Sequence, residues 1–494
     1  LCTKTYLQAR MLNTRKGPAV QGLRLQIDKQ AYSKLSQKVL NETENLTIVC
    51  DMVSDLIFDK EKKIEGVKTR NGQEYFAPAV VLTTGTFLKG LIHIGHKNYS
   101  AGRQGEESVD TLSQSLRNLD LKLVRLKTGT PPRLLRSSLN FSVMEYQGSD
   151  DLDYLFEFTP CKVEHKIGCY ITRTNKDTHE TILKNSHLSP IFTGHITGTP
   201  PRYCPSIEDK ISRFKDKDSH HIFVEPESAS SEEIYPNGLS TSLPLEIQEQ
   251  FIRTIVGFEN AIIVRPGYAI EYDAVLPNQL QHTLEVKTVP GLFLAGQING
   301  TTGYEEAAGQ GIIAGINAHL KVAGKNPYIM QRHEGYIGVM IDDLVTMGVD
   351  EPYRMFTSRA ERRLILRQDN VFDRLGDKAY SLGLIDKEMY DEILKERNII
   401  KVTLSKIKNS VHTEIMRMFS NGSIEEIQKK INELSGPVPY RTLQTIQAEL
   451  LYGPYIKREE KEIEKTVYYQ KLEIPENFDY SNIPGLSIEL SQKL

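Results

Sequence analysis

The sequence of 494 residues has no tryptophan, only five cysteines and no long apolar run. A membrane span needs roughly 18 consecutive apolar residues, so this absence argues against an integral membrane protein. The cysteine count is odd, and no cysteines form a Cys-x-x-Cys pair. This spacing indicates neither a disulfide framework nor a zinc ribbon, and it favours a reducing compartment.

Two motifs of enzyme chemistry are also missing. The histidines show no HExxH or comparable spacing, so we expect no metal site. No GxxxxGK(S/T) loop occurs, so this chain should not itself hydrolyse nucleoside triphosphates.

Lys plus Arg number 61 against 64 Asp plus Glu, which gives a net charge of −3. A nearly neutral chain has no global attraction for nucleic acid, so any such site must be a local basic patch.

The length predicts about three domains at roughly 150 residues each. The chain begins at Leu1 without the pattern of a signal or transit peptide. It ends at Leu494 inside an apolar periodic stretch that has no helix terminator. We therefore expect a segment to be missing at each end.

The first half of the chain is typical of strands joined by short loops. Residues 52–58 are strand-like, and residues 64–70 and 74–77 flank Asn71-Gly72, which predicts a hairpin with a primed turn. Residues 79–83 are continuously apolar, as expected of a parallel strand covered on both faces. This order, ending in a tight glycine turn, indicates a nucleotide-binding α/β domain.

The most distinctive unit spans residues 291–324. A short apolar strand leads into a glycine-rich loop and then into a helix, with Ile312, Ile316 and Leu320 on one predicted face. The amides of such a loop and of a helix N-terminus suit a phosphate or an anionic ring oxygen. An ordinary strand-to-helix turn has the same pattern, so both interpretations stand.

Composition divides the rest of the chain. Residues 147–278 are richer in Pro, His, Ser and Thr, as in an inserted domain, and the pattern after about residue 326 is helical and charged. Ser423 opens a capping box there, and Gly436-Pro437 is the stop signal. The apolar stripe between them consists of Ile424, Ile427, Ile431 and Leu434.

Cys204 is the cysteine in a reactive setting. It lies close to Arg202, whose guanidinium would stabilise a thiolate and favour a nucleophilic role. A small buried side chain is the alternative interpretation. Cys161 and Cys169 are interpreted as structural, and Cys50, in a strand-like run, as a core residue.

Two basic segments are candidates for phosphate contact. Lys127 and Arg133 flank a Thr-Gly-Thr-Pro-Pro sequence, a rigid loop suited to phosphate or to a domain hinge. Steps of four residues would place Arg359, Arg363 and Arg367 on one helical face. Three guanidinium groups on one face can hold a nucleic-acid backbone, and a solvated face paired with nearby acidic residues fits the pattern equally well.

Seven longer strings occur together in one order. They are KGPAV (16–20), LTTGTFL (82–88), VRLKTGTPPR (124–133), PRYCPSIEDK (201–210), IYPNGLSTSLP (234–244), AGQINGTTGYEEAA (295–308) and EPYRMFTSRAE (351–361). Together they closely resemble the MnmG (GidA) family of flavin-dependent tRNA uridine 5-carboxymethylaminomethyl modification enzymes. The similarity runs from about residue 10 to Leu494.

The resemblance implies an α/β fold, with a glutathione-reductase-like FAD-binding domain, an inserted α/β domain and a C-terminal helical domain. The FAD-binding domain would comprise residues 1–146 and 279–325, and the inserted NAD-binding-like domain residues 147–278. Residues 326–494 would form the helical domain that binds tRNA and a partner. The GxGxxG segment that opens the family's FAD domain has no counterpart here, nor has the family's second catalytic cysteine, and we expect both to precede Leu1.

The implied activity adds a carboxymethylaminomethyl or aminomethyl group to carbon 5 of the wobble uridine of tRNA. Family members act with the GTPase MnmE, use FAD and NADH, and take the carbon from methylenetetrahydrofolate. They form homodimers, and a heterotetramer with MnmE is expected. The compartment would be the cytoplasm of a bacterium, or the mitochondrion of a eukaryote. A stand-alone flavoprotein oxidoreductase acting on a small molecule is the alternative, and a non-catalytic scaffold is a third.

The resemblance also indicates site residues. Cys204 aligns with a family cysteine implicated in catalysis, either by addition to carbon 6 of the uracil or by general acid–base support. The FAD positions are Val53, Ser108, Gly296, Gln297, Gly300 and Gly303. The NAD positions lie within residues 200–214 and are Pro200, Arg202, Tyr203, Ser206 and Phe214. The candidates for tRNA contact are Lys127, Arg133, Arg359, Arg363 and Arg367.

Overall fold

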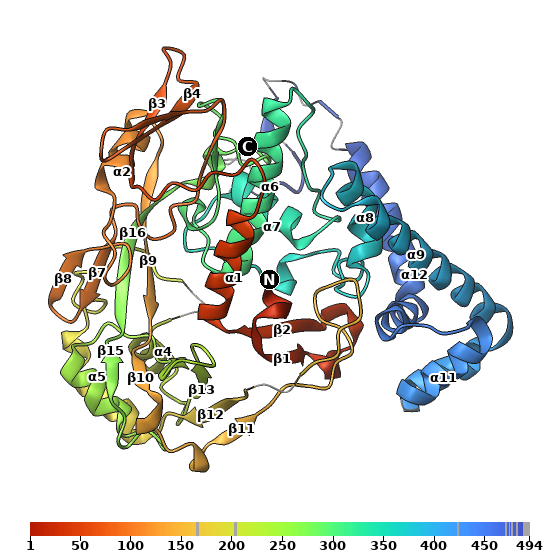
Figure 1. Ribbon diagram of the computed structural model, residues 1–494, viewed down its shortest axis with the longest axis horizontal. Helices are drawn as coiled ribbons and strands as arrows, with labels where there is room; N and C mark the ends of the chain where they lie inside the picture. The colour runs from red at the N-terminus through yellow and green to blue at the C-terminus, as the bar shows by residue number, and fades with distance from the viewer. Residues whose placement is uncertain are drawn as a thin grey trace.

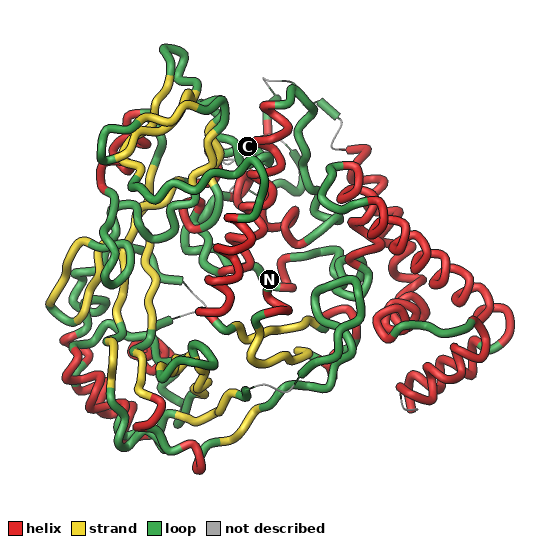
Figure 2. Tube along the Cα trace, in the orientation of Figure 1, coloured by secondary structure: helices red, strands yellow, loops and turns green. Residues whose placement is uncertain are grey.

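The computed structural model of the chain describes residues 1–164, 167–201, 205–421, 424–469, 472–473, 475, 478–480 and 483–487. Figure 1 and Figure 2 show the β-sheets on one side of the molecule and long helices that extend from the other side. The helices on that side, α9, α11 and α12, come from the C-terminal part of the chain. The C-terminal helices therefore lie on the opposite side of the molecule from most of the sheets.

Two short parallel strands support the glycine-rich loop. β6 (Val80–Leu82) pairs in parallel with β17 (Leu292–Leu294), as the continuous apolar runs predicted. Helix α6 (Tyr304–Val322) follows the loop after β17, and α7 (Tyr336–Met347) packs against α6. Buried residues of all four elements belong to the largest hydrophobic core. This core fixes the two ends of the loop.

A three-stranded antiparallel sheet packs on the same core. β4 (Ile64–Thr69) pairs with β3 (Val53–Phe58) on one side and with β5 (Glu74–Phe76) on the other. Gly72 has a φ of +84° in the turn between β4 and β5, a conformation that suits glycine because it has no Cβ. The predicted hairpin is therefore confirmed, but its turn is not the predicted primed type, because Asn71 has no positive φ and Gly72 N donates to Thr69 O. Helix α2 (Asp110–Asn118) packs on β3.

A four-stranded antiparallel sheet has the order β8-β7-β16-β9. Its strands are β7 (Leu91–Ile94), β8 (Lys97–Ser100), β9 (Leu123–Thr130) and β16 (Tyr268–Val275). β16 is an inner strand, and all its residues after the first are buried. Segments that lie far apart in the sequence therefore meet in one sheet.

The middle of the chain folds around a six-stranded antiparallel sheet of order β11-β12-β13-β14-β10-β15. Its strands are β10 (Arg133–Leu135), β11 (Glu145–Gln147), β12 (Cys169–Arg173), β13 (His221–Pro226), β14 (Glu233–Asn237) and β15 (Ile263–Arg265). The helices that share its core are α3 (Lys176–Lys184), α4 (Ile207–Arg213) and α5 (Leu245–Ile252). The sheet begins in the sequence with β10 at Arg133 and ends with β15 at Arg265. β10 therefore lies outside the predicted inserted domain of residues 147–278, whose limits stay a prediction.

The N-terminal segment joins this middle unit. β1 (Tyr6–Leu12) and β2 (Gly22–Ile27) form an antiparallel pair, followed by α1 (Lys29–Asn41). Asp28 caps α1 by accepting a hydrogen bond from Ala31 N at 2.8 Å. The side chain of Asp28 also accepts a hydrogen bond from the amide of Ala229, which lies beyond β13.

The C-terminal part is helical. It contains α8 (Val371–Ser381), α9 (Lys387–Ser410), α10 (His412–Asn421), α11 (Ile424–Ser435) and α12 (Tyr440–Tyr469). The predicted stripe of α11 is confirmed, because Ile427 and Ile431 are buried in the helical core. Gly436 follows with φ +85°, while Ser423 lies outside the described residues. No helix in the described ranges is long and apolar enough to span a membrane.

Two local expectations are wrong. Cys50 is exposed and lies outside the strands of the described chain, because β3 begins only at Val53. The predicted face of α6 is correct for Ile316 and Leu320, which pack in the main core, but wrong for Ile312, which is 51% exposed while Ile313 is 1% exposed. A short apolar run does not by itself distinguish a strand from an exposed loop, which explains Cys50. Adjacent isoleucines fit two neighbouring helical faces equally well, which explains Ile312.

Candidate functional site

Two glycine turns lie side by side at the carboxyl ends of β6 and β17. Gly85 (φ +56°) follows β6, and Gly296 (φ +89°) follows β17 and precedes the short 3-10 helix η8 (Gln297–Asn299). A Cβ placed on Gly85 would lie 3.7 Å from Gln297 Oε1, so the two turns are in contact range. The carboxyl edge of parallel strands is where open α/β sheets bind ligands.

A buried glutamine holds the loop after β17 in shape. Gln310 of α6 is fully buried, and its Oε1 accepts hydrogen bonds from Gly296 N at 3.1 Å and from Asn299 Nδ2 at 2.9 Å. Its Nε2 donates to Thr301 Oγ1 at 3.0 Å. One side chain therefore ties both halves of the loop to the helix that follows. Sequence patterns gave no signal for this role.

Gly303 forms the junction between the loop and α6. It has φ +147°, and a Cβ there would overlap the Glu306 carboxylate. That Cβ would also lie 2.8 Å from Arg354 Nη1. Only glycine fits at this point, so the junction has a fixed geometry.

A segment from the C-terminal part completes the loop. Tyr353 N donates a hydrogen bond to Gly300 O at 2.8 Å, and Tyr353 O accepts one from Thr302 N at 3.0 Å. Met355 N donates to Glu306 Oε1 at 2.9 Å. The string at residues 351–361 was the only sequence signal for this contact.

Tyr353 also links the loop to α7. Its hydroxyl donates to Asp343 Oδ2 at 2.7 Å, and Arg332 Nη1 lies 2.7 Å from Asp343 Oδ1. Burial and the neighbouring Asp343 raise the pKa of Tyr353, so the hydroxyl stays a donor at neutral pH. The Arg359 guanidinium lies 4.3 Å from the centre of the Tyr353 ring.

Four buried polar atoms in and beside the loop have no hydrogen-bond partner within the described part of the chain. They are Thr84 Oγ1, Asn299 Oδ1, Thr302 Oγ1 and Glu306 Oε2. Buried polar atoms are nearly always paired, so this set is suited to a polar ligand. The N-terminus of α6 has no side-chain cap, so its first amides are donors for a polar ligand, while Glu305 and Glu306 in the same turn oppose a charged anion. The residues here therefore fit the polar edge of a nucleotide cofactor.

Comparison with known proteins decides the family. Residues 1–326 match the family described as glucose inhibited division protein A. The chain belongs to the GidA family.

Relatives of known sequence and structure agree with this assignment. A Thermodesulfovibrio yellowstonii protein named tRNA uridine 5-carboxymethylaminomethyl modification enzyme MnmG is 46% identical over 511 residues, covering 99% of this chain and 82% of that protein. A Helicobacter pylori protein of the same name is 44% identical over 515 residues, with the same coverage. The structure of Aquifex aeolicus GidA in its form II crystal has a TM-score of 0.87 and 44% identity, covering 99% of this chain and 82% of that one. The predicted GidA-like α/β fold with its C-terminal helical domain is therefore confirmed.

The predicted FAD positions fall in two places. Gly296, Gln297, Gly300 and Gly303 lie together in the glycine-rich loop. Val53 begins β3 and packs against the same core as the loop, while Ser108 lies just before α2, with its Oγ 2.6 Å from Ser100 Oγ. Their contacts with FAD stay a prediction.

The predicted NAD segment is described in part. Arg202 and Tyr203 lie outside the described residues, and so does Cys204. Ser206 is buried and caps α4, where its Oγ accepts a hydrogen bond from Asp209 N at 3.3 Å. Phe214 follows α4 and is exposed, and Pro200 precedes residues 202–204 in the sequence.

The predicted basic loop around Lys127 and Arg133 is instead part of two strands. Lys127 lies in β9, opposite Glu271, and is 3% exposed. Arg133 begins β10, forms an ion pair with Glu227 and stacks 4.5 Å from the centre of the Tyr235 ring. Surface contact between Lys127 and a phosphate is therefore wrong, because its ammonium group is inside the protein. Arg133 is largely covered by its partners.

The predicted helix through Arg359, Arg363 and Arg367 is also wrong. Arg359 ends the short 3-10 helix η9 (Thr357–Arg359), and turns follow it. The Arg367 side chain is fully buried between Asp369 and Glu449. Arg367 therefore cannot contact a phosphate in this conformation, whereas Arg363 is exposed.

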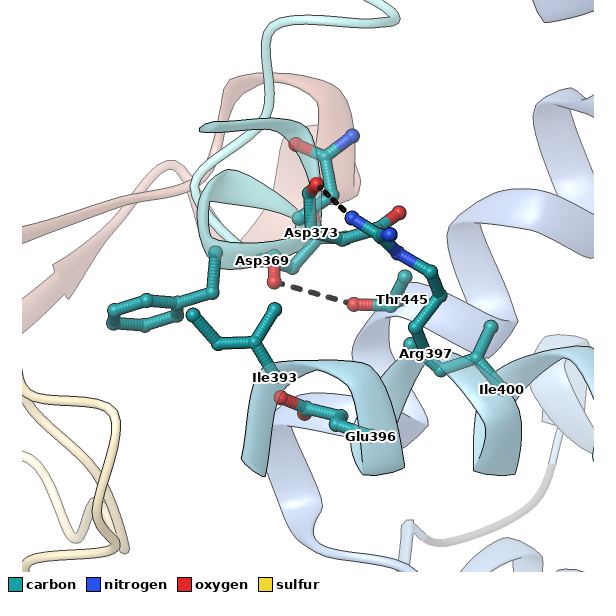
Figure 3. A pocket seen from close by; sticks show the side chains of 9 residues that line it. Asp369, Asp373, Ile393, Glu396, Arg397, Ile400 and Thr445 are labelled. Atoms are coloured by element: carbon teal, nitrogen blue, oxygen red, sulfur yellow. Dashed lines mark hydrogen bonds and ion pairs between the residues drawn. The ribbon is translucent and has the colours of Figure 1, made fainter. Parts of the chain in front are cut away.

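Two cavities are lined by residues of the C-terminal helices and contain none of the glycine-rich loop. The smaller is about 10 Å³, and Figure 3 shows Arg397 reaching Asp373 across it and Thr445 donating to the Asp369 carbonyl. That volume holds about one water molecule. The larger, about 410 Å³, is lined by residues of the 153–160 segment and of α9 and α12. Neither cavity is lined by a predicted site residue. The described residues also hold no group of three or more His, Cys, Asp or Glu arranged for a metal ion.

Proposed function

We propose that this chain is a flavin-dependent enzyme that modifies carbon 5 of the wobble uridine of tRNA, adding a carboxymethylaminomethyl or aminomethyl group. The observation that carries the proposal is the glycine-rich loop, with its unpaired buried polar atoms at the carboxyl edge of β6 and β17. The tRNA uridine modification named for the 44–46% identical relatives supports the substrate.

The cofactor in this proposal is FAD. Gly296, Gly300 and Gly303 would let the loop backbone approach the cofactor closely, and the first amides of α6 would donate hydrogen bonds to it. Gln297 would contact it from the side of the Gly85 turn. When bound, FAD would supply hydride transfer between NADH and a carbon derived from methylenetetrahydrofolate. Val53 and Ser108 complete the proposed FAD contacts, and residues 200–214 would hold NADH.

Cys204 is the proposed catalytic residue. In the nucleophilic form of the proposal, its thiolate bonds to carbon 6 of the uracil and makes carbon 5 nucleophilic. Carbon 5 then attacks the electrophilic one-carbon unit, loses its proton, and the bond from sulfur to carbon 6 breaks. In the other form, Cys204 donates and accepts protons without a covalent bond. Trapping a protein–RNA adduct distinguishes the two, since only the first form produces one.

The proposal includes the RNA and protein partners. Arg363 and Arg359 are the remaining candidates for the tRNA backbone, because Lys127 and Arg367 are buried and Arg133 is largely covered. The target base lies in a stacked anticodon loop and must be turned out to react. A homodimer, a complex with the GTPase MnmE and a bacterial cytoplasmic or eukaryotic mitochondrial setting complete the proposal.

Nucleoside mass spectrometry of total tRNA tests the proposed function. We expect the carboxymethylaminomethyl-type uridines to vanish in cells that lack the full-length gene and to return with a complementing copy. A complementing copy with Cys204→Ser should not restore them. If the modified uridines persist in the deletion strain, the proposal fails, and a small-molecule flavoprotein oxidoreductase becomes the working hypothesis.

A further inference from the structure

Residues 1–27 carry charge of one sign. Their charged side chains are all basic, with no Asp or Glu among them, and are Lys4, Arg10, Arg15, Lys16 and Arg24. The chain as a whole has a net charge of −3, so this segment departs from the rest of the protein. A local basic cluster in a nearly neutral protein is typical of a surface that binds a polyanion.

Two of these cations are paired with acidic residues, whereas two others are not. Arg10 Nε lies 3.3 Å from Asp150 Oδ1, and Arg24 Nη2 lies 2.7 Å from Glu225 Oε1. The side chains of Arg15 and Lys16 are exposed, and neither forms an ion pair within the described part of the chain. Their positive charges are therefore available to a partner.

The two unpaired cations lie in residues 13–21, which connect β1 to β2 and are called the basic loop below. Asn13 Nδ2 donates to Val20 O at 3.1 Å and closes the loop, while Lys16 N donates to Asn13 O at 2.9 Å. Pro18 is buried. The loop therefore has a defined shape, and a contact that is already ordered loses less conformational entropy on binding.

Helix α12 lies against the basic loop. Gly17 has a φ of +85°, and a Cβ there would lie 2.8 Å from the Tyr452 hydroxyl oxygen. Tyr455 follows three residues later on α12 and is 62% exposed, so the helical spacing places its ring next to Tyr452. An exposed aromatic ring beside free cations suits single-stranded nucleic acid, whose unpaired bases stack on such rings.

The basic loop is also tied to the segment that contains Arg363. Leu23 N, which follows the loop on β2, donates to Gln368 Oε1 at 2.6 Å. A chain advances at most roughly 3.5 Å per residue, so Arg363, five residues before Gln368, lies within about 18 Å of it along the backbone. Arg363 is exposed. The loop and Arg363 are therefore close enough to contact the same nucleic-acid molecule.

We propose that the basic loop binds the phosphate backbone of tRNA through Arg15 and Lys16, and that Tyr455 stacks on an unpaired base beside it. The inference rests on the proposed function, in which tRNA is the substrate. It adds to that function a contact surface built from the first strand connection and α12. Phosphate contacts carry no sequence information, so the loop positions the tRNA and does not select the uridine.

Fluorescence anisotropy of a labelled tRNA transcript, titrated with the 494-residue chain at several salt concentrations, tests the inference. The transcript is unmodified and has uridine at the wobble position. Arg15→Gln combined with Lys16→Gln removes two phosphate contacts. We expect the dissociation constant to rise by about tenfold. The slope of log affinity against log salt should become shallower by roughly 1.5–2.

Lys60→Gln combined with Lys63→Gln is the matched control. Both lysines are exposed between β3 and β4, and the change removes the same two charges from another surface. The dissociation constant of this control should stay within about twofold of wild type. The inference is overturned if the variant of Arg15 and Lys16 binds tRNA as tightly as the control does, or if the wild-type chain binds no tRNA.

Tyr455→Ala tests the stacking contact separately. Its dissociation constant should rise by about fivefold or more, with an unchanged salt slope, because stacking releases no counterions. Tyr455→Phe keeps the ring and should return the dissociation constant to within about twofold of wild type. Wild-type affinity in Tyr455→Ala would overturn the stacking contact.

An anionic lipid surface is the other polyanion that free cations attract. Co-sedimentation with vesicles of phosphatidylcholine and phosphatidylglycerol separates the two partners. If the variant of Arg15 and Lys16 loses vesicle binding but keeps wild-type tRNA binding, the inference is overturned in favour of a lipid surface.

These results are independent of the test of the proposed function, because tRNA binding needs neither folate nor flavin. Modified uridines that vanish in the deletion strain, together with unaltered tRNA binding by the variant of Arg15 and Lys16, would remove only this inference. Modified uridines that persist, together with weakened tRNA binding by that variant, would remove the proposed function and leave an RNA-binding surface.

Discussion

The guanidinium of Arg367 binds the carboxylate of Asp369 inside the C-terminal part of the protein, with 3.1 Å between Nε and Oδ1. Glu449 of α12 lies 3.0 Å from the other end of the guanidinium. Replacing Arg367 with methionine leaves the buried Asp369 carboxylate without its cation. We expect Arg367→Met to lower the free energy of unfolding by about 3–5 kcal/mol, as measured by urea denaturation.

Arg363→Met is the matched control for this prediction. Arg363 is exposed, so its loss should change the free energy of unfolding by no more than about 0.5 kcal/mol. Under the proposed function, Arg363→Glu should also weaken tRNA binding and make it less dependent on salt. An Arg367→Met protein as stable as wild type would contradict the buried ion pair.

Adjacent isoleucines on α6 test which face of the helix is buried. Ile313 is 1% exposed within the main core, and Ile312 is 51% exposed. Ile313→Ala should therefore cost about 2–5 kcal/mol through lost burial and a cavity, and Ile312→Ala about 0.5 kcal/mol or less. Thermal and urea unfolding measure both variants. Equal losses at the two positions would show that the face is assigned wrongly.

Acid should weaken the protein through Glu271. Burial opposes a charge on Glu271, but hydrogen bonds from His93 and from two backbone amides lower its folded-state pKa to about 2, below its ordinary value of 4.5. The stabilisation is therefore complete above about pH 4.5 and is lost as the pH falls toward 2, at no more than about 1.4 kcal/mol per pH unit for one group. Urea midpoints over this range measure the loss. Glu271→Gln should flatten the pH dependence, and an unchanged slope would count against the ionised carboxylate.

The two cysteines Cys169 and Cys50 should differ sharply in reactivity. Burial and then the nearby Glu225 raise the pKa of the Cys169 thiol to about 12. Few Cys169 thiolates form at mildly alkaline pH, and the side chain is covered. We expect iodoacetamide to modify the exposed Cys50 in the native protein and to spare Cys169 until urea unfolds the chain. Rapid native modification of Cys169 would contradict its placement in β12.

Sequence patterns correctly predicted those elements whose structure depends mainly on neighbouring residues. The apolar run at β6 and the hairpin at Asn71-Gly72 depend on neighbouring residues, and both are confirmed, although the turn type of the hairpin is not the predicted one. The stripe of α11 holds for the same reason. Residue spacing gave the wrong prediction where the structure depends on a residue far away in the sequence. The four-residue steps from Arg359 to Arg367 resemble a solvated helix face until Glu449 is brought beside Arg367.

The candidate site shows the same division. The glycines of the loop could be predicted, because a strand, a glycine-rich turn and a helix follow one another in the sequence. The groups that hold the loop could not, because Gln310 is an ordinary helix residue until it reaches Gly296 and Asn299. Tyr353 meets Gly300 only after the chain has passed through α6 and α7.

The contact of Tyr353 with the loop has a consequence for how this protein can be divided. The family match ends at residue 326, yet the main-chain partners of Gly300 and Thr302 lie at residue 353. A protein cut at the end of the match would leave two backbone groups of the loop unpaired and Glu306 without Met355. The segment around residue 353 is therefore part of the scaffold of the loop, and a chimaera joined at residue 326 would change the loop along with the helices.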